Sequence, residues 1–227
     1  MKLLVNALVK FVLGIVLVML LVFIPAGTLS YFNGWLFIGL LFIPMFIFGI
    51  YLFFKKPELL RRRLNNKEKE GTQKFVVLIS ALLFIGGFIV CGLDYRYGFS
   101  KLPDYIVIIG SVLLLIGYAL YIEVMRENEY LLRTIEIEKE QKVVDTGLYG
   151  LVRHPMYLSV ILLFLSFPLV LGSLYGFYIF LIFPLVLIIR IRNEEKILVK
   201  ELKGYSKYKL KVKYKLIPFI WWFYLHF

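Results

Sequence analysis

The chain has 227 residues, of which 61% are hydrophobic and 18% aromatic, and its mean hydropathy is +0.83. A soluble globular domain has roughly 45–50% apolar residues, so this excess must face lipid, which excludes a soluble enzyme, a disordered chain and a coiled coil. The net charge is +12. In so lipophilic a chain, an excess of positive charge is typical of cytoplasmic loops near anionic headgroups rather than of nucleic-acid binding.

Four apolar runs are long enough to cross a bilayer, which takes about 20 residues of helix. They cover residues 3–24, 35–54, 75–93 and 105–122. A fifth run, 156–189, is too long for one straight span. Because Pro168, Gly172 and Ser173 interrupt it, we expect a helical hairpin, with Pro184 kinking the second arm. The predicted fold is an all-α polytopic integral membrane protein, with four full-length transmembrane helices and a C-terminal hairpin, giving five to six spans.

Lys and Arg concentrate in the loop 55–74 and in the tail after residue 189. The positive-inside rule places both segments, and with them the N- and C-termini, in the cytoplasm. The polar segment 123–153 adds to this face. Its first residues extend the fourth span, residues 142–144 form a short extended piece, and Asp145-Thr146-Gly147 marks a turn. We expect a single membrane domain, with transmembrane helices in 1–122 and the functional region in 123–227.

Three further features concern structure. The single cysteine, Cys91, lies in an apolar run and predicts a buried, unreactive thiol, and no His, Cys or carboxylate spacing indicates a metal site. Gly86 and Gly87 predict a helix-packing site. The tail predicts an aromatic and basic belt at the membrane surface, because Lys alternates there with Tyr205, Tyr208, Tyr214, Trp221 and Trp222.

The first cluster of chemical interest is Arg153-His154-Pro155-Met156-Tyr157, at the start of the fifth run. Pro155 suits the first position of a helix, because its missing N–H would have no partner there. The free amides of such a first turn bind an anion such as a carboxylate, with Arg153 and His154 beside it. The alternative is a snorkelling arginine and an interfacial histidine at a helix start.

The second cluster is Arg190-Ile191-Arg192-Asn193-Glu194-Glu195, at the inner end of the hairpin's second arm. Arg190 and Glu194 are four residues apart and share a helix face. The hairpin brings this pair near Arg153 and His154. A cation and a carboxylate at the membrane edge can hold a zwitterionic ligand, and the alternative is an interfacial salt bridge worth about 0.5 kcal/mol.

Together these motifs resemble the isoprenylcysteine carboxyl methyltransferase family. The resemblance covers roughly residues 123–222 and is carried by the segment 141–157, by Arg190-x-x-x-Glu194-Glu195 and by the ending Gly204-Tyr205-x-x-Tyr208. The same C-terminal architecture is similar to that of phospholipid N-methyltransferases and, more remotely, of membrane sterol reductases. The resemblance implies a membrane enzyme that uses S-adenosyl-L-methionine at its cytosolic face and acts on a lipidic or prenylated acceptor.

The resemblance also implies roles for single residues. Arg190 and Glu194 are the candidate catalytic residues, and Arg190 is a candidate substrate ligand. Arg153, beside the expected anion-binding helix start, is a second candidate substrate ligand. Glu195 stays open as a ligand in place of Glu194. The candidate cofactor-binding residues are Gln141, Lys142, Val143, Val144, Tyr149, His154, Pro155, Met156, Tyr157, Glu194 and Glu195.

The chemistry of methyl transfer favours a carboxylate acceptor. A carboxyl group with a pKa near 4 is already ionised at neutral pH and needs only orientation by a cation such as Arg190. An amine acceptor must first lose a proton. We therefore expect carboxyl O-methylation of an isoprenylcysteine-like substrate. The alternatives are a phospholipid amine N-methyltransferase, an NADPH-dependent membrane reductase, and a membrane scaffold or transporter subunit, which the gathering of polar residues at one face disfavours.

Overall fold

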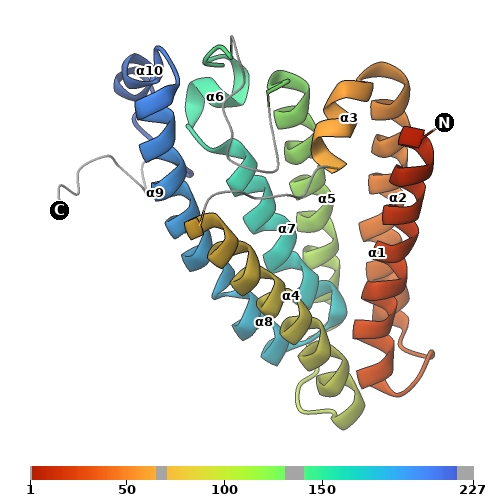
Figure 1. Cartoon of the computed structure of the whole chain (residues 1–227). Helices are drawn as coiled ribbons and strands as arrows, with labels where there is room; N and C mark the ends of the chain where they lie inside the picture. The colour runs from red at the N-terminus through yellow and green to blue at the C-terminus, as the bar shows by residue number, and fades with distance from the viewer. Residues whose placement is uncertain (1, 65–70, 131–140, 219–227) are drawn as a thin grey trace.

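The computed structural model describes residues 2–64, 71–130 and 141–218. The fold is all-α and polytopic, as predicted (Figure 1). Five segments are long and apolar enough to span a membrane. They belong to α1 (Lys2–Ala26), α2 (Phe32–Lys55), α4 (Gly71–Tyr97), α5 (Asp104–Glu127) and the pair α8 (Leu174–Phe180) and α9 (Phe183–Glu201). The four predicted full-length spans are confirmed, each with one or more residues added at either end.

The short helices α3 (Pro57–Leu64), α6 (Gly147–Leu151) and α10 (Tyr205–Lys211) lie at one end of the bundle, together with the start of α1 (Figure 1). We call this the polar end. It gathers α3 from the basic loop after α2, α6 from the segment after α5 and α10 from the basic tail. The predicted orientation requires these three segments on one side of the membrane. Lys10, about two turns into the first span, donates to the carbonyl of Leu64 at the end of α3. The assignment of this end to the cytoplasm stays a prediction.

The predicted hairpin is present. Its first arm is α7 (Pro155–Leu171), which is 17 residues long, and its second arm is formed by α8 and α9. Gly172 ends α7 at a φ of +75°, a left-handed conformation that costs glycine no steric strain. The Ser173 side chain then accepts from the Gly176 amide and caps α8. Pro168 was wrongly expected to interrupt the helix, since it lies inside α7. Pro184 opens α9 rather than kinking one long arm.

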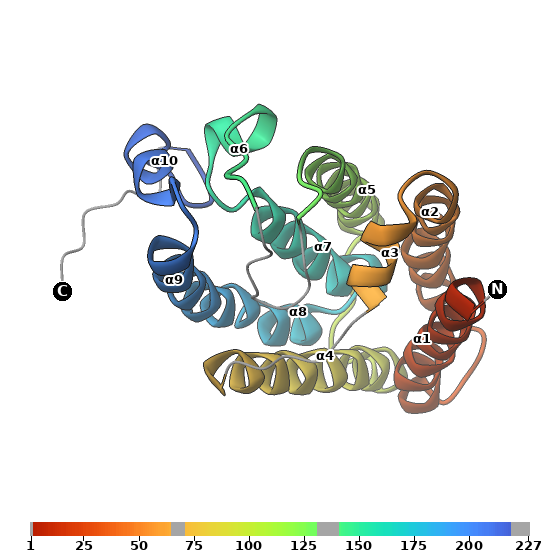
Figure 2. The same ribbon diagram turned by 45° about the horizontal axis from the view of Figure 1, so that its top comes forward.

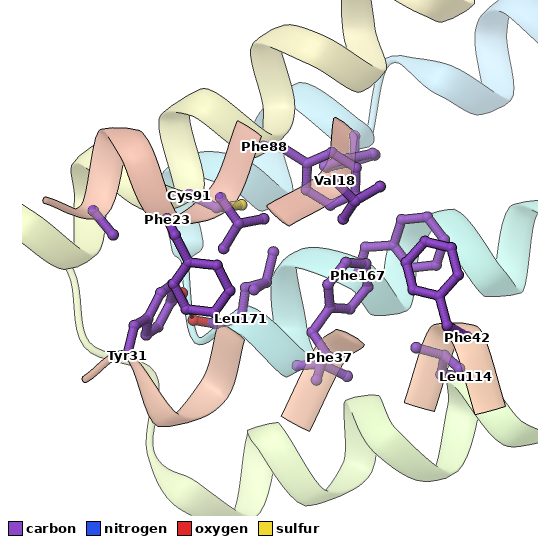
Figure 3. Packing of buried hydrophobic residues seen from close by; sticks show 14 of the residues in the cluster. Val18, Phe23, Tyr31, Phe37, Phe42, Phe88, Cys91, Leu114, Phe167 and Leu171 are labelled. Atoms are coloured by element: carbon purple, nitrogen blue, oxygen red, sulfur yellow. Dashed lines mark hydrogen bonds between the residues drawn. The ribbon is translucent and has the colours of Figure 1, made fainter. Parts of the chain in front are cut away.

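The main core lies where α1, α2, α4, α5, α7 and α8 meet, and it is rich in aromatic side chains (Figure 3). Phe37 and Phe88 are fully buried, and Phe167 packs against both rings. Cys91 is buried in the same cluster and forms no disulfide, as predicted. Large apolar side chains elsewhere on α1, α2 and α5 point outward, which is the arrangement that a lipid environment allows.

Small residues bring α5 and α7 into close contact. A Cβ atom at Gly110 would lie 2.6 Å from the Cβ of Leu169, and one at Gly117 would lie 3.0 Å from the Cγ of Leu163. Membrane helices associate through packing rather than through a hydrophobic driving force, so such close approach stabilises the pair. The two glycines therefore fix α7, which carries the first cluster of interest, against α5.

At the end of the bundle opposite the polar end, a buried carboxylate ties the loop after α4 to the hairpin turn. Asp94 accepts hydrogen bonds from the Ser100 amide at 2.7 Å and from the Ser100 hydroxyl at 2.6 Å. It also accepts from the Ser173 hydroxyl at 2.5 Å. Since Ser173 also caps α8, this cluster holds the turn of the hairpin in place.

The predicted packing site in the third span is formed by Gly87 alone. A Cβ atom at Gly87 would lie 2.5 Å from the ring of the buried Phe180, whereas nothing lies within 4 Å of one at Gly86. Gly87→Ala should therefore lower the free energy of unfolding by about 1–3 kcal/mol through overpacking. The neighbouring control, Gly86→Ala, should leave stability unchanged or raise it by up to about 1 kcal/mol, because alanine favours the helix. Thermal unfolding in detergent measures both, and equal shifts would contradict the assignment.

Candidate functional site

The two predicted clusters meet at the polar end, where the start of α7 faces the last turns of α9. Figure 2 looks toward this end and shows α6 and α10 on the side of α7 and α9, away from α1 and α2. His154 is the residue before α7, and Pro155 occupies its first position, as predicted. Arg190, Glu194 and Glu195 all lie on α9. The hairpin therefore brings the clusters together.

Glu195 is a buried carboxylate among three basic side chains. Its Oε1 accepts from Arg153 Nε at 2.7 Å and lies 3.3 Å from His154 Nε2. Its Oε2 lies 3.0 Å from Lys215 Nζ. Glu195 is only 5% exposed. A charge so deeply buried needs close partners of the opposite sign to offset its loss of hydration, and here both carboxylate oxygens have them.

The same group fastens the C-terminal tail. Arg153 Nη1 donates to the carbonyl oxygens of Val212 and Lys213, at 2.7 and 3.0 Å. The amides of Arg153 and His154 donate to the carbonyls of Tyr214 and Lys215. These contacts fix residues 212–215 beside the entrance to α7. We call Glu195, Arg153, His154 and Lys215 the tail clamp.

Glu194, next to the tail clamp, has different surroundings. The hydroxyl of Tyr157 donates to Glu194 Oε2 and accepts from Arg190 Nε at 3.0 Å. The Arg190 guanidinium lies 6.0 Å from the centre of the Tyr157 ring. Arg190 and Glu194 are half-buried, while Tyr157 is buried. Tyr157 thus links the candidate substrate ligand to the candidate cofactor ligand, and both charged groups remain partly accessible.

The segment before α7 is anchored to the end of α5. Glu127 accepts from the Leu148 amide through both carboxylate oxygens, at 3.2 and 3.0 Å. A Cβ atom at Gly147 would lie 1.5 Å from Glu127, and Gly147 has a φ of +51°, so only glycine fits this turn. Asn128 Nδ2 donates to the hydroxyl of Tyr149 at 3.0 Å. Burial raises the pKa of Tyr149 well above its ordinary value, so its phenol stays neutral.

The remaining predicted residues are placed as follows. Residues 141–145 have neither helix nor strand, so the extended piece expected at 142–144 pairs with no other strand. Val143 packs against the cluster of Leu202, Tyr205, Tyr208 and Val212. Lys142 is exposed, and Gln141, Val144 and Met156 are half-buried. Arg153, predicted to bind substrate, has its guanidinium engaged in the tail clamp, which favours a positioning role.

The tail differs from the expected surface belt. Tyr205 and Tyr208 are 4% and 6% exposed and pack on each other and on Val143, so they belong to the interior. The Tyr208 hydroxyl donates to the carbonyl of Tyr149 at 2.7 Å. The expectation was wrong because lysines alternate with aromatic residues equally well on a buried helix face. Trp221 and Trp222 lie outside the described residues.

Sequence reasoning missed several groups around the site. Gln73, at the start of α4, is fully buried and its side-chain amide lies 3.5 Å from the carbonyl of Arg190, so the N-terminal half reaches the site as well. Asn128 was also missed, and Lys215 was counted only as part of a basic tail. A polar residue next to an apolar run was the one available signal for Gln73.

Within the described residues, no three His, Cys, Asp or Glu side chains are grouped to hold a metal ion.

The tail clamp predicts opposite behaviour for two adjacent glutamates. Glu195→Gln removes the charge that three basic groups share, so the free energy of unfolding should fall by about 3–5 kcal/mol. Trypsin should then cut faster at Lys207, Lys209, Lys211 and Lys213. The matched control, Glu194→Gln, should leave the cleavage rate in the tail near that of the native chain. Limited proteolysis followed by mass spectrometry measures this, and equal protection of the tail in both variants would exclude the clamp.

Comparison with known proteins agrees with this geometry. Residues 105–204 match the family model described as phospholipid methyltransferase. The match runs from the first turn of α5 to the residue before α10, so it includes both clusters but ends before residues 212–215, which the tail clamp holds. A stretch of 93 residues is 31% identical to the Delta(14)-sterol reductase of Mus musculus. That alignment covers 40% of this chain and 22% of the reductase, so this chain spans about a fifth of its relative. The protein is thus a multi-pass membrane protein in which residues 105–204 are similar to the phospholipid methyltransferase family.

Proposed function

We propose that this protein is an S-adenosyl-L-methionine-dependent methyltransferase acting on a lipidic or lipid-attached acceptor. The observation that carries the proposal is the linked group of Arg190, Tyr157 and Glu194, which lies inside the matched region at the polar end of a membrane bundle. Polar groups gathered at the ends of membrane helices are functional candidates, because they are costly to keep there. Methyltransferases of this family use S-adenosyl-L-methionine as methyl donor.

The residues at the site suit such a cofactor, which carries an ammonium, a carboxylate, a sulfonium and an adenine. Glu194 is a half-buried carboxylate whose site can take the ammonium or a ribose hydroxyl. In the first turn of α7 the Met156 amide can donate to a carboxylate, since Pro155 has no N–H and the amides of Tyr157 and Leu158 donate to the His154 carbonyl. The rings of Tyr149 and Tyr157 provide aromatic faces for adenine or a cation. When bound, the cofactor supplies an electrophilic methyl group, and the chain's own residues hold donor and acceptor in line and exclude water.

The acceptor that we propose is a carboxylate, as in an isoprenylcysteine-like substrate. Arg190 is the half-buried cation nearest to Glu194 along the same helix face and can orient an anionic acceptor. His154, the residue best suited to deprotonate an amine, is 4% exposed and faces Glu195 in the tail clamp. A carboxylate needs no base, so this arrangement favours O-methylation.

Two other candidates each have an observation in their favour. The matching family model is that of phospholipid methyltransferases, which supports a phospholipid amine acceptor. The stretch similar to a sterol reductase supports an NADPH-dependent reductase. The methyl donor separates the reductase from both methyltransferases, and the chemical class of the labelled product separates the two methyltransferases from each other.

Binding of S-adenosylhomocysteine to the purified protein in nanodiscs tests the proposal by calorimetry. We expect saturable binding that Glu194→Gln weakens about tenfold or more, because a charge-assisted hydrogen bond is lost. Arg190→Ala should abolish transfer of a labelled methyl group to a prenylcysteine acceptor while leaving the affinity for S-adenosylhomocysteine within about twofold.

The controls separate the roles. NADPH, titrated in parallel, should give no heat of binding, and binding of NADPH without S-adenosylhomocysteine would favour the reductase. Loss of cofactor binding in Arg190→Ala would remove the division between the substrate and cofactor ligands. Labelling of a phospholipid amine in place of prenylcysteine would exclude the carboxylate acceptor and leave the methyltransferase class standing.

A further inference from the structure

A buried tyrosine hydroxyl lies beside the candidate cofactor site without a hydrogen-bond partner. Tyr205 is the first residue of α10 and is 4% exposed. Its hydroxyl oxygen is buried and has no hydrogen-bond partner among the residues that the structure describes. Native proteins rarely leave a buried hydroxyl unpaired, because it has lost its water and gained nothing in return. Such a group needs an explanation.

Tyr205 belongs to the buried cluster against which Val143, a candidate cofactor-binding residue, packs. Burial raises the pKa of Tyr205 far above its ordinary value, and the charges of Glu195 and Glu194 raise it further. The phenol therefore keeps its proton and is a hydrogen-bond donor at every physiological pH. Glu195 is occupied by the tail clamp, whereas Glu194 remains half-buried.

The other buried tyrosines of this region all have partners. The hydroxyl of Tyr208 donates to the Tyr149 carbonyl, the hydroxyl of Tyr149 accepts from Asn128, and that of Tyr157 bonds to both Glu194 and Arg190. The ring of Tyr205 is 5.6 Å from that of Tyr208, so the two side chains share one buried environment. The unpaired hydroxyl is thus particular to Tyr205 and does not reflect a loosely packed tail.

We propose that Tyr205 is a cofactor-binding residue, whose hydroxyl donates a hydrogen bond to an acceptor oxygen of bound S-adenosyl-L-methionine. This inference rests on the proposed function and extends it. Tyr205 lies directly after the matched region, which ends at residue 204. The tail clamp holds the segment after α10 and so helps to fix the position of Tyr205.

The test compares two single-atom deletions on the same short helix. Tyr205→Phe removes a hydroxyl that has no partner in the free protein. The unfolding temperature of the ligand-free protein should therefore stay unchanged or rise, while the dissociation constant for S-adenosylhomocysteine should increase about three- to tenfold. Tyr208→Phe removes the bond to the Tyr149 carbonyl, so it should lower the unfolding temperature of the ligand-free protein. Calorimetry and thermal unfolding in nanodiscs measure both quantities.

The outcomes are distinct. A Tyr205→Phe variant that binds S-adenosylhomocysteine as tightly as the native chain would overturn the inference and leave the proposed function intact. A drop in unfolding temperature for Tyr205→Phe, with unchanged affinity, would also overturn it, since the hydroxyl would then be structural. If the native chain itself fails to bind S-adenosylhomocysteine while folded, the proposed function is rejected and this inference with it.

Discussion

The arrangement of the polar end depends on one buried charge. Glu195 loses most of its hydration, and only the close approach of Arg153, His154 and Lys215 offsets that loss. These partners come from the entrance to α7 and from the tail beyond α10, so satisfying one carboxylate joins three segments that are distant in the sequence. The hairpin brings α7 and α9 together, and the tail clamp fixes residues 212–215 against the start of α7. Without this ion group, the tail would be a basic peptide free to lie on the headgroups.

Adjacent residues on a helix point about 100° apart, and the two glutamates use this difference. Glu195 faces the tail and is paired with the protein's own basic side chains. Glu194 faces Tyr157 and remains half-buried. The sequence alone leaves the two interchangeable, because helix phase near a span's end cannot be read from one residue. The structure separates them by partner and by exposure. It also gives Arg153 a role inside the tail clamp, although its position beside an anion-binding helix start favoured a substrate ligand.

The parts of the fold that follow from hydropathy were predictable. The four long spans and the hairpin depend on burying apolar length in a bilayer, and an error of one to five residues in the ends of the spans changes little. The short helices were harder: α3, α6 and α10 are eight residues or fewer and are stabilised by contacts that only the assembled end supplies. The tail was misread for a related reason. Tyr205 and Tyr208 form a buried pair whose spacing in the sequence is equally that of an interfacial helix, and only the packing of Val143 against them distinguishes the two.

The close contact between α5 and α7 has a consequence for how a lipid reaches the site. At Gly110 and Gly117 the two helices leave no room even for a methyl group, so an acyl or prenyl chain cannot pass between them. These two contacts lie about 10 Å apart along α5, at 1.5 Å per residue, and at the polar end Glu127 and Asn128 join α5 to α6. For the proposed lipidic acceptor, the route to the site must therefore lie on a different side of the bundle, because glycine at these two positions lets the backbones of α5 and α7 meet closely.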